Sequence, residues 1–276
     1  MRQAILAGAL GLAAIATPAQ AQSPKWAPEA GTLPYRYVAV QKMPDRSEQG
    51  FRMDYDLVSD GKGGLIAVVL RAEHGKPDAW VEAEVDEACR TSLHARPGEL
   101  ARITLAPVAP AVAASMGEAF MAACAPQDIF SPMTDILNVA QVQLAPHFGL
   151  ARLARAGDTR RFPAFAVKIE RFDTAASIAA PGGSTTLSAL APDRATIDWV
   201  PDPMTVDILM RGAMSGADVS LKGTQNFAFR ILIDPRTGAL LGATAPAGKL
   251  DLTMTLPGGF SQPLPVVREV VIAPRR

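Results

Sequence analysis

Apolar and polar residues alternate with a period of two along much of the chain, which is the pattern of strands with one buried and one solvated face. In the stretch 51–57 (FRMDYDL) apolar and charged residues alternate without exception. Further strand patterns lie at 65–70, 80–85, 102–106, 165–169, 185–190, 195–200, 206–210, 227–233, 249–256 and 266–272. Turn sequences such as 59–64 (SDGKGG) and 191–194 (APDR) separate neighbouring patterns, so we expect antiparallel hairpins.

The middle of the chain changes to a helical period. Apolar residues recur every three to four positions and predict an amphipathic helix over about 110–124. Ser131 as N-cap and Pro132 as first helical residue predict a second helix, and 147–156 adds a short third one. These elements predict a helical insertion around residues 110–156.

Many short strands with one helical block indicate an α+β fold that is mostly antiparallel β. We expect a large curved sheet or half-barrel with a central helical segment packed on its apolar face. This layout resembles the periplasmic lipoprotein carriers of the LolA and LolB type, whose half-barrel is closed by helices. The resemblance implies a cavity for acyl chains. It carries over no binding residues, because no family motif matches residue by residue.

The N-terminus has the three parts of a signal peptide. Met1-Arg2 is basic, residues 4–16 are an uncharged apolar run, and Ala19-Gln20-Ala21 offers small residues to a signal peptidase. We therefore predict a signal peptide over 1–21, cleaved after Ala21, an extended leader over 22–34, and a single β-rich domain over 35–276. No cysteine follows the cut and no Arg-Arg pair precedes the apolar run, so the pattern favours a Sec-type route and not a lipoprotein.

The predicted destination is the periplasm or the medium. No later run reaches the ~20 apolar residues of a membrane-spanning helix, so no transmembrane segment is expected after cleavage. Lys plus Arg and Asp plus Glu both number 27, which gives no electrostatic reason to bind nucleic acid. Cys89 and Cys124 are the two cysteines of the chain, and in an oxidising compartment they predict a structural disulfide.

Two short motifs resemble those of serine acyl-transferases. Ser59 and Lys62 stand in an S-x-x-K pattern, and the triplet Arg236-Thr237-Gly238 resembles K-T-G. Both have a simpler interpretation as turns, because Ser59 begins a Gly-rich connection and 234–238 (DPRTG) combines Asp, Pro and Gly at turn positions. We expect no catalytic residues, no metal site and no cofactor, since His74, His94 and His147 also form no ligand motif.

One segment is locally basic. Arg152, Arg155, Arg160 and Arg161 lie close together with few acidic neighbours. This patch has two interpretations, contact with an anionic surface or partner and an ordinary solvated face.

These observations together predict an exported periplasmic, non-enzymatic protein that binds an apolar small molecule or lipid in a cavity lined by the sheet. The alternative is a structural or assembly factor of the cell envelope, which acts through contacts with an envelope protein. A serine hydrolase or acyl-transferase is the third reading.

Overall fold

The protein is described here by a computed structural model in which residues 24–26, 28–43, 47–62, 64–76, 79–84, 91–95, 101–105, 139, 142, 153–170, 174–214 and 216–275 are placed. The predicted signal peptide and both cysteines lie outside these residues. The elements are β1 (Gly31–Lys42), β2 (Glu48–Ser59), β3 (Leu65–Lys76), β4 (Ala79–Glu84), β5 (Thr91–Ala95), β6 (Ala101–Leu105), β7 (Thr159–Phe162), β8 (Phe165–Glu170), β9 (Thr174–Ala180), β10 (Gly183–Ala191), β11 (Arg194–Pro201), β12 (Met204–Met214), β13 (Ala217–Asn226), β14 (Phe229–Ile233), β15 (Leu240–Thr255), the 3-10 turn η4 (Pro257–Gly259) and β16 (Ser261–Pro274).

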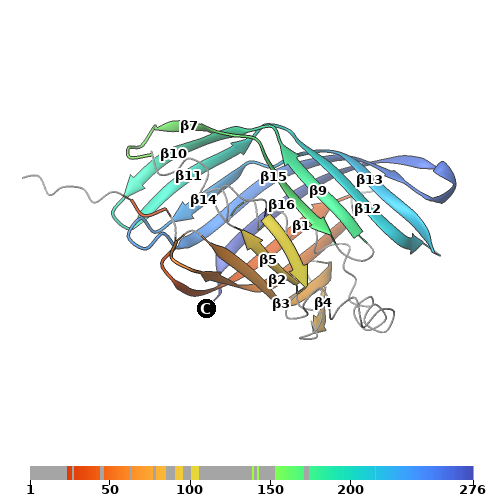
Figure 1. The fold of residues 1–276 in the computed structure, drawn as a ribbon, viewed down its shortest axis with the longest axis horizontal. Helices are drawn as coiled ribbons and strands as arrows, with labels where there is room; N and C mark the ends of the chain where they lie inside the picture. The colour runs from red at the N-terminus through yellow and green to blue at the C-terminus, as the bar shows by residue number, and fades with distance from the viewer. Residues whose placement is uncertain are drawn as a thin grey trace, which may run out of the picture.

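All strands of the described residues belong to one 16-stranded sheet, with the order β13-β12-β9-β8-β6-β5-β3-β2-β1-β16-β15-β14-β11-β10-β7 and β4 beside β3. The pairings are antiparallel except that of β6 with β8. The long strand β15 pairs with β14 through its first residues and with β13 through its last ones. Because β13 also pairs with β12, the strands from β13 round to β15 form a closed circuit, from which β14, β11, β10 and β7 extend (Figure 1).

The register explains how the alternating sequence builds a core. Tyr37 of β1 lies opposite Met53 of β2 and Ile272 of β16, and Ile272 lies opposite Ala243 of β15. Directly opposite residues of an antiparallel pair share one face of the sheet. All four side chains are buried, so apolar positions from distant parts of the sequence form a single inward face.

The predicted strands and hairpins are confirmed. Residues 51–57 lie in β2, which pairs with β3 across the turn at 59–64. β10 and β11 form the hairpin predicted across 191–194. At 234–238 the Asp234 N–H donates to the Ala239 carbonyl at 2.9 Å, and Gly238 takes a left-handed φ of 74°.

The predicted α+β class is wrong. The described chain is almost entirely antiparallel sheet, and no central helical segment is found packed on the sheet among the described residues. Within the predicted insertion 110–156, Val139 and Val142 have helical backbone and are buried in the core, while most of the range lies outside the described residues. The physical reason is that a sheet that curls buries its inward face against itself, so the class does not depend on a covering layer of helices. In the part of the chain that is described, no helix is long and apolar enough to cross a membrane.

Candidate functional site

The inward side of β12, β13, β15 and β16 is lined by aliphatic side chains, here called the aliphatic face: Ile208, Leu221, Leu252, Met254 and Leu264. In one row across the sheet Ile208 lies opposite Leu221, which lies opposite Met254. In the neighbouring row Leu252 lies opposite Leu264. The register thus joins residues from four strands into one apolar surface.

Burial of the aliphatic face decreases toward the turn between β15 and β16. Leu252 is buried, whereas Met254 and Leu264 are half-buried. At the turn itself Phe260 is 61% exposed. This hairpin extends to one end of the molecule in Figure 1. The aliphatic face is therefore a part of the inward surface that protein covers incompletely.

The strands β7, β8, β11 and β14 contribute most of a second inward region, the aromatic cluster, which consists of Phe162, Phe165, Trp199, Phe227 and Phe229. Phe162 stacks on Trp199 with ring centroids 5.5 Å apart and an interplanar angle of 10°. Phe229 lies 6.1 Å from Trp199 on a tilted plane and 6.1 Å from Phe227. Offset and tilted ring pairs at these distances add to the energy of apolar burial.

Two glycines make room for this cluster. A Cβ atom on Gly183 would lie 2.2 Å from the ring of Phe162, and one on Gly248 would lie 2.2 Å from the ring of Phe227. Gly183 lies on β10 opposite Phe162 of β7, and Gly248 lies on β15 beside the segment between β13 and β14 that contains Phe227. The rings therefore occupy the space that any other residue at these positions would need.

Polar groups also lie on the inward side. The Tyr35 hydroxyl donates to the Leu240 carbonyl at 3.1 Å, and burial raises the pKa of Tyr35 to about 12 although this hydrogen bond acts in the opposite direction. Arg268 is buried on β16, and its Nη2 donates to Gln41 Oε1 at 3.0 Å. Thr185 Oγ1 and Trp199 Nε1 are buried with no hydrogen-bond partner among the residues that the structure describes.

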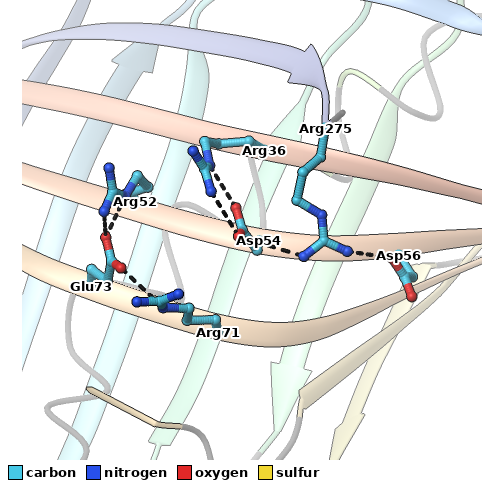
Figure 2. A network of polar contacts seen from close by, with 7 residues as sticks. All are labelled: Arg36, Arg52, Asp54, Asp56, Arg71, Glu73 and Arg275. Atoms are coloured by element: carbon cyan, nitrogen blue, oxygen red, sulfur yellow. Dashed lines mark hydrogen bonds and ion pairs between the residues drawn. The ribbon is translucent and has the colours of Figure 1, made fainter. Parts of the chain in front are cut away.

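The outer side of β1, β2 and β3 carries a network of charged residues, shown in Figure 2. Arg36 donates to both carboxylate oxygens of Asp54, at 2.7 and 2.9 Å. Arg275, near the end of the chain, bridges Asp54 at 3.5 Å and Asp56 at 3.0 Å. Because Arg275 follows β16, these bonds tie the C-terminus across β1 to β2.

A second group of the same network centres on Glu73, which is buried. Arg52 and Arg71 both pair with its carboxylate, Arg71 at 3.0 Å. Glu73 lies opposite Arg52, and Arg71 lies opposite Asp54, in the register of β2 and β3. Opposite charges therefore alternate across three strands.

Asp54 shows the electrostatic effect of this arrangement. Burial acts to raise the pKa of its carboxyl group, but the hydrogen bonds from Arg36 and the charges of Arg36 and Arg275 outweigh that effect. The pKa of Asp54 is therefore held below its usual range, and the carboxylate stays ionised at neutral pH.

The predicted site residues lie in different surroundings. Cys89, Cys124 and Arg152 lie outside the described residues, so the structure does not place the predicted disulfide. Arg161 forms an ion pair with Asp202 at 2.6 Å on the outside of the sheet. Arg155 and Arg160 are both exposed.

The residues of the acyl-transferase-like motifs take part in turns. Ser59 Oγ donates to the Pro28 carbonyl at 2.9 Å and accepts from the Gly61 N–H at 3.1 Å. The Thr237 carbonyl accepts from the Glu29 N–H at 3.3 Å. Residues 28 and 29 thus contact both turns. Each motif has a role in chain reversal that accounts for its residues.

Sequence reasoning missed the charged network and the pair of Thr185 and Trp199. The alternation at 51–57 placed Asp54 on a solvated strand face, yet Asp54 is only 6% exposed. Four arginines from four separate segments surround the two buried carboxylates, and no local sequence pattern indicates these pairings. The only available signal was the unusual density of charge on this strand.

No protein-family model matches the chain, and a search of the curated proteins gives no match. Among solved structures the chain is similar to DynF from the dynemicin biosynthesis pathway of Micromonospora chersina, with 10% identity, a TM-score of 0.26 and coverage of 96% of this chain and 92% of that one. A protein assigned as an AttH from Nitrosomonas europaea has 9% identity, a TM-score of 0.22 and coverage of 92% and 98%.

A LolA superfamily protein from Nitrosomonas europaea is also similar, with 11% identity, a TM-score of 0.15 and coverage of 91% of this chain and 89% of that one. The resemblance in layout expected from the sequence is thus found among solved structures.

Proposed function

We propose that this chain is an exported periplasmic, non-enzymatic protein that binds an apolar molecule against the inward side of its sheet. The observation that carries the proposal is the aliphatic face, an inward apolar surface that is half-buried at Leu221, Met254 and Leu264. A bound aliphatic chain would remove this remaining surface from water. Each buried CH₂ group of such a ligand contributes ~0.8 kcal/mol.

The composition of the face suits ligands of variable shape. Leu and Met are flexible, and Met in particular adapts to irregular apolar surfaces. The ion pairs of Figure 2 lie on the outer side of β1, β2 and β3, away from the inward apolar side. The expected ligand class is therefore a lipid or another largely aliphatic molecule.

Native mass spectrometry of the protein purified from its own envelope tests the proposal. We expect co-purified lipid, and a fluorescent acyl probe should bind with lower affinity in a Leu221→Asn variant. Leu241→Asn is the matched control, because Leu241 is exposed on β15. Absence of both lipid and probe binding in the unaltered protein, or equal loss in both variants, would refute the proposed site.

Export and lack of catalysis have separate tests. Intact-mass analysis of the periplasmic fraction should give a chain that begins at Gln22. Retention of residues 1–21 in the mature protein would refute the predicted cleavage. Fluorophosphonate and penicillin probes should leave the protein unlabelled, and covalent labelling at Ser59 would overturn the non-enzymatic assignment.

A second candidate function, an envelope assembly factor, is favoured by a different observation. The outer side of β16 exposes Val267 and Val271, and Phe260 is exposed at the end of the same hairpin. Exposed apolar side chains in a group are typical of surfaces that contact other proteins. Crosslinking in intact cells distinguishes the two functions, because an assembly factor would give a specific crosslinked partner that a Val271→Asp variant loses.

A further inference from the structure

Thr185 and Trp199 are neighbours on the inward side of the sheet. They lie directly opposite each other in the register of β10 and β11. Both residues are 0% exposed. Directly opposite residues of an antiparallel pair have Cβ atoms about 4.5–5.5 Å apart, so a single small group can contact both side chains.

The polar atoms of this pair are unsatisfied. Neither Thr185 Oγ1 nor Trp199 Nε1 has a hydrogen-bond partner in the part of the chain that the structure describes. A buried polar atom without a partner costs about 1–3 kcal/mol, and native proteins contain few of them. An unsatisfied atom on each of two directly opposite residues indicates that a further molecule supplies the missing hydrogen bonds.

The surrounding rings fix the direction of the indole N–H. Trp199 stacks on Phe162 at 5.5 Å and contacts Phe165 and Phe229 at 6.1 Å each. The indole cannot rotate without disrupting these contacts. Its N–H is therefore a donor of fixed orientation in an apolar environment, where a hydrogen bond is stronger than in water.

The chemistry of the pair defines the group that fits. An indole N–H only donates, while a hydroxyl can donate and accept, so the two together suit a hydrogen-bond acceptor. The cation next to this pair in the register is Arg160 of β7, which lies opposite Thr185, but its side chain is exposed. A buried carboxylate requires a close cation or several donors, whereas a neutral carbonyl oxygen is satisfied by two.

We propose that Trp199 Nε1 and Thr185 Oγ1 bind the carbonyl oxygen of a neutral apolar ligand, such as an ester or a ketone. This inference rests on the proposed function and specifies its ligand class. The aliphatic part of the ligand lies among apolar side chains of the inward face, and the carbonyl is recognised within the aromatic cluster. The short edge strand β7, with only Phe162 buried, borders this position.

The experiment compares a long-chain methyl ester with the alkane of the same length, using the mature full-length protein with ¹⁵N-labelled tryptophan. The chain has three tryptophans, and the Trp199→Phe variant assigns the indole signal of Trp199. We expect the ester to move this signal downfield and the alkane to leave it in place. Trp199→Phe and Thr185→Val should each weaken ester binding about tenfold without changing alkane binding. Thr244→Val, at an exposed position on β15, is the matched control.

The possible outcomes separate this inference from the proposed function. If ester and alkane bind equally well to the unaltered protein and to both variants, the inference is wrong, the pair is satisfied by water, and the binding function stands. If the free acid binds much more tightly than the ester, the neutral ligand class is wrong. If neither ester nor alkane binds, the proposed function itself fails.

Discussion

Replacement of Asp54 by Asn tests whether the charged network on the outer side of β1, β2 and β3 stabilises the fold. The substitution keeps the size of the side chain and removes its charge. Asp54 has a side chain that is 7% exposed, whereas those of Arg36 and Arg275 are 42% and 29% exposed. Removing one partner of a fully buried ion pair costs ~3–5 kcal/mol. Exposed ion pairs contribute at most about 1 kcal/mol to stability. Because both arginines can regain contact with water when Asp54 is replaced, we expect a loss between these limits, of about 2 kcal/mol in the free energy of unfolding.

Thermal and urea unfolding at neutral pH measure this loss. For a domain of this size, about 2 kcal/mol corresponds to a decrease in Tm of roughly 4–8 °C. Asp207→Asn is the matched control, because Asp207 pairs with Lys222 at 3.2 Å with side chains that are 55% and 65% exposed. The control should change stability by less than ~0.5 kcal/mol. If Asp54→Asn and Asp207→Asn lose the same free energy of unfolding, the charged network does not stabilise the fold more than an exposed ion pair does.

The pH dependence gives an independent check on the same group. The folded-state pKa of Asp54 is lower than the pKa of an unfolded Asp, so between these two pKa values the folded state binds fewer protons than the unfolded state. The stabilisation is therefore complete above the unfolded pKa and is lost as the pH falls through the lowered folded pKa. The difference in stability between the unaltered protein and Asp54→Asn should shrink in acid, and a constant difference would contradict the assignment.

Three further predictions concern packing, turn electrostatics and redox state. Gly248→Ala should destabilise the fold by ~1–3 kcal/mol in urea unfolding, because its Cβ would lie 2.2 Å from the ring of Phe227, and a smaller residue at 227 should reduce that loss. The hydrogen bonds from the Arg236 side chain and backbone lower the pKa of Asp234 to about 2, so Arg236→Gln should raise that pKa in an NMR titration, and an unchanged value would refute the role of the side chain. Non-reducing mass spectrometry should show the mature chain two hydrogen masses lighter than its reduced form, whereas two alkylatable thiols would exclude the predicted disulfide.

The hairpins could be predicted because their determinants are local. At 234–238 Asp234 accepts the N–H of Arg236 at 2.9 Å, and Gly238 takes the left-handed conformation, as the DPRTG sequence predicts. The fold class could not be predicted in the same way. Apolar residues at helical spacing in the middle of the chain suggested a covering layer, but that pattern does not report how far a sheet curls onto itself.

The candidate sites depend on register between distant strands. The aliphatic face needs Leu221 opposite Met254, and the donor pair needs Thr185 opposite Trp199. Neither relation is visible in a window of sequence. Asp54 looked like an ordinary solvated residue because its partners Arg36 and Arg275 lie far from it along the chain.

The sequence by itself determined many of the strands, which face of those strands is apolar and where their hairpins turn, because these properties follow from local periodicity and turn chemistry. The strands β1, β5, β7, β9 and β13 were not predicted. Only the tertiary structure decided that β13 pairs with β15, that the apolar faces meet inside one curled sheet, and that Asp54 and Glu73 are buried among arginines. These features arise from strand pairing over long separations. Such pairing is selected by the free energy of the whole sheet and not by any single segment.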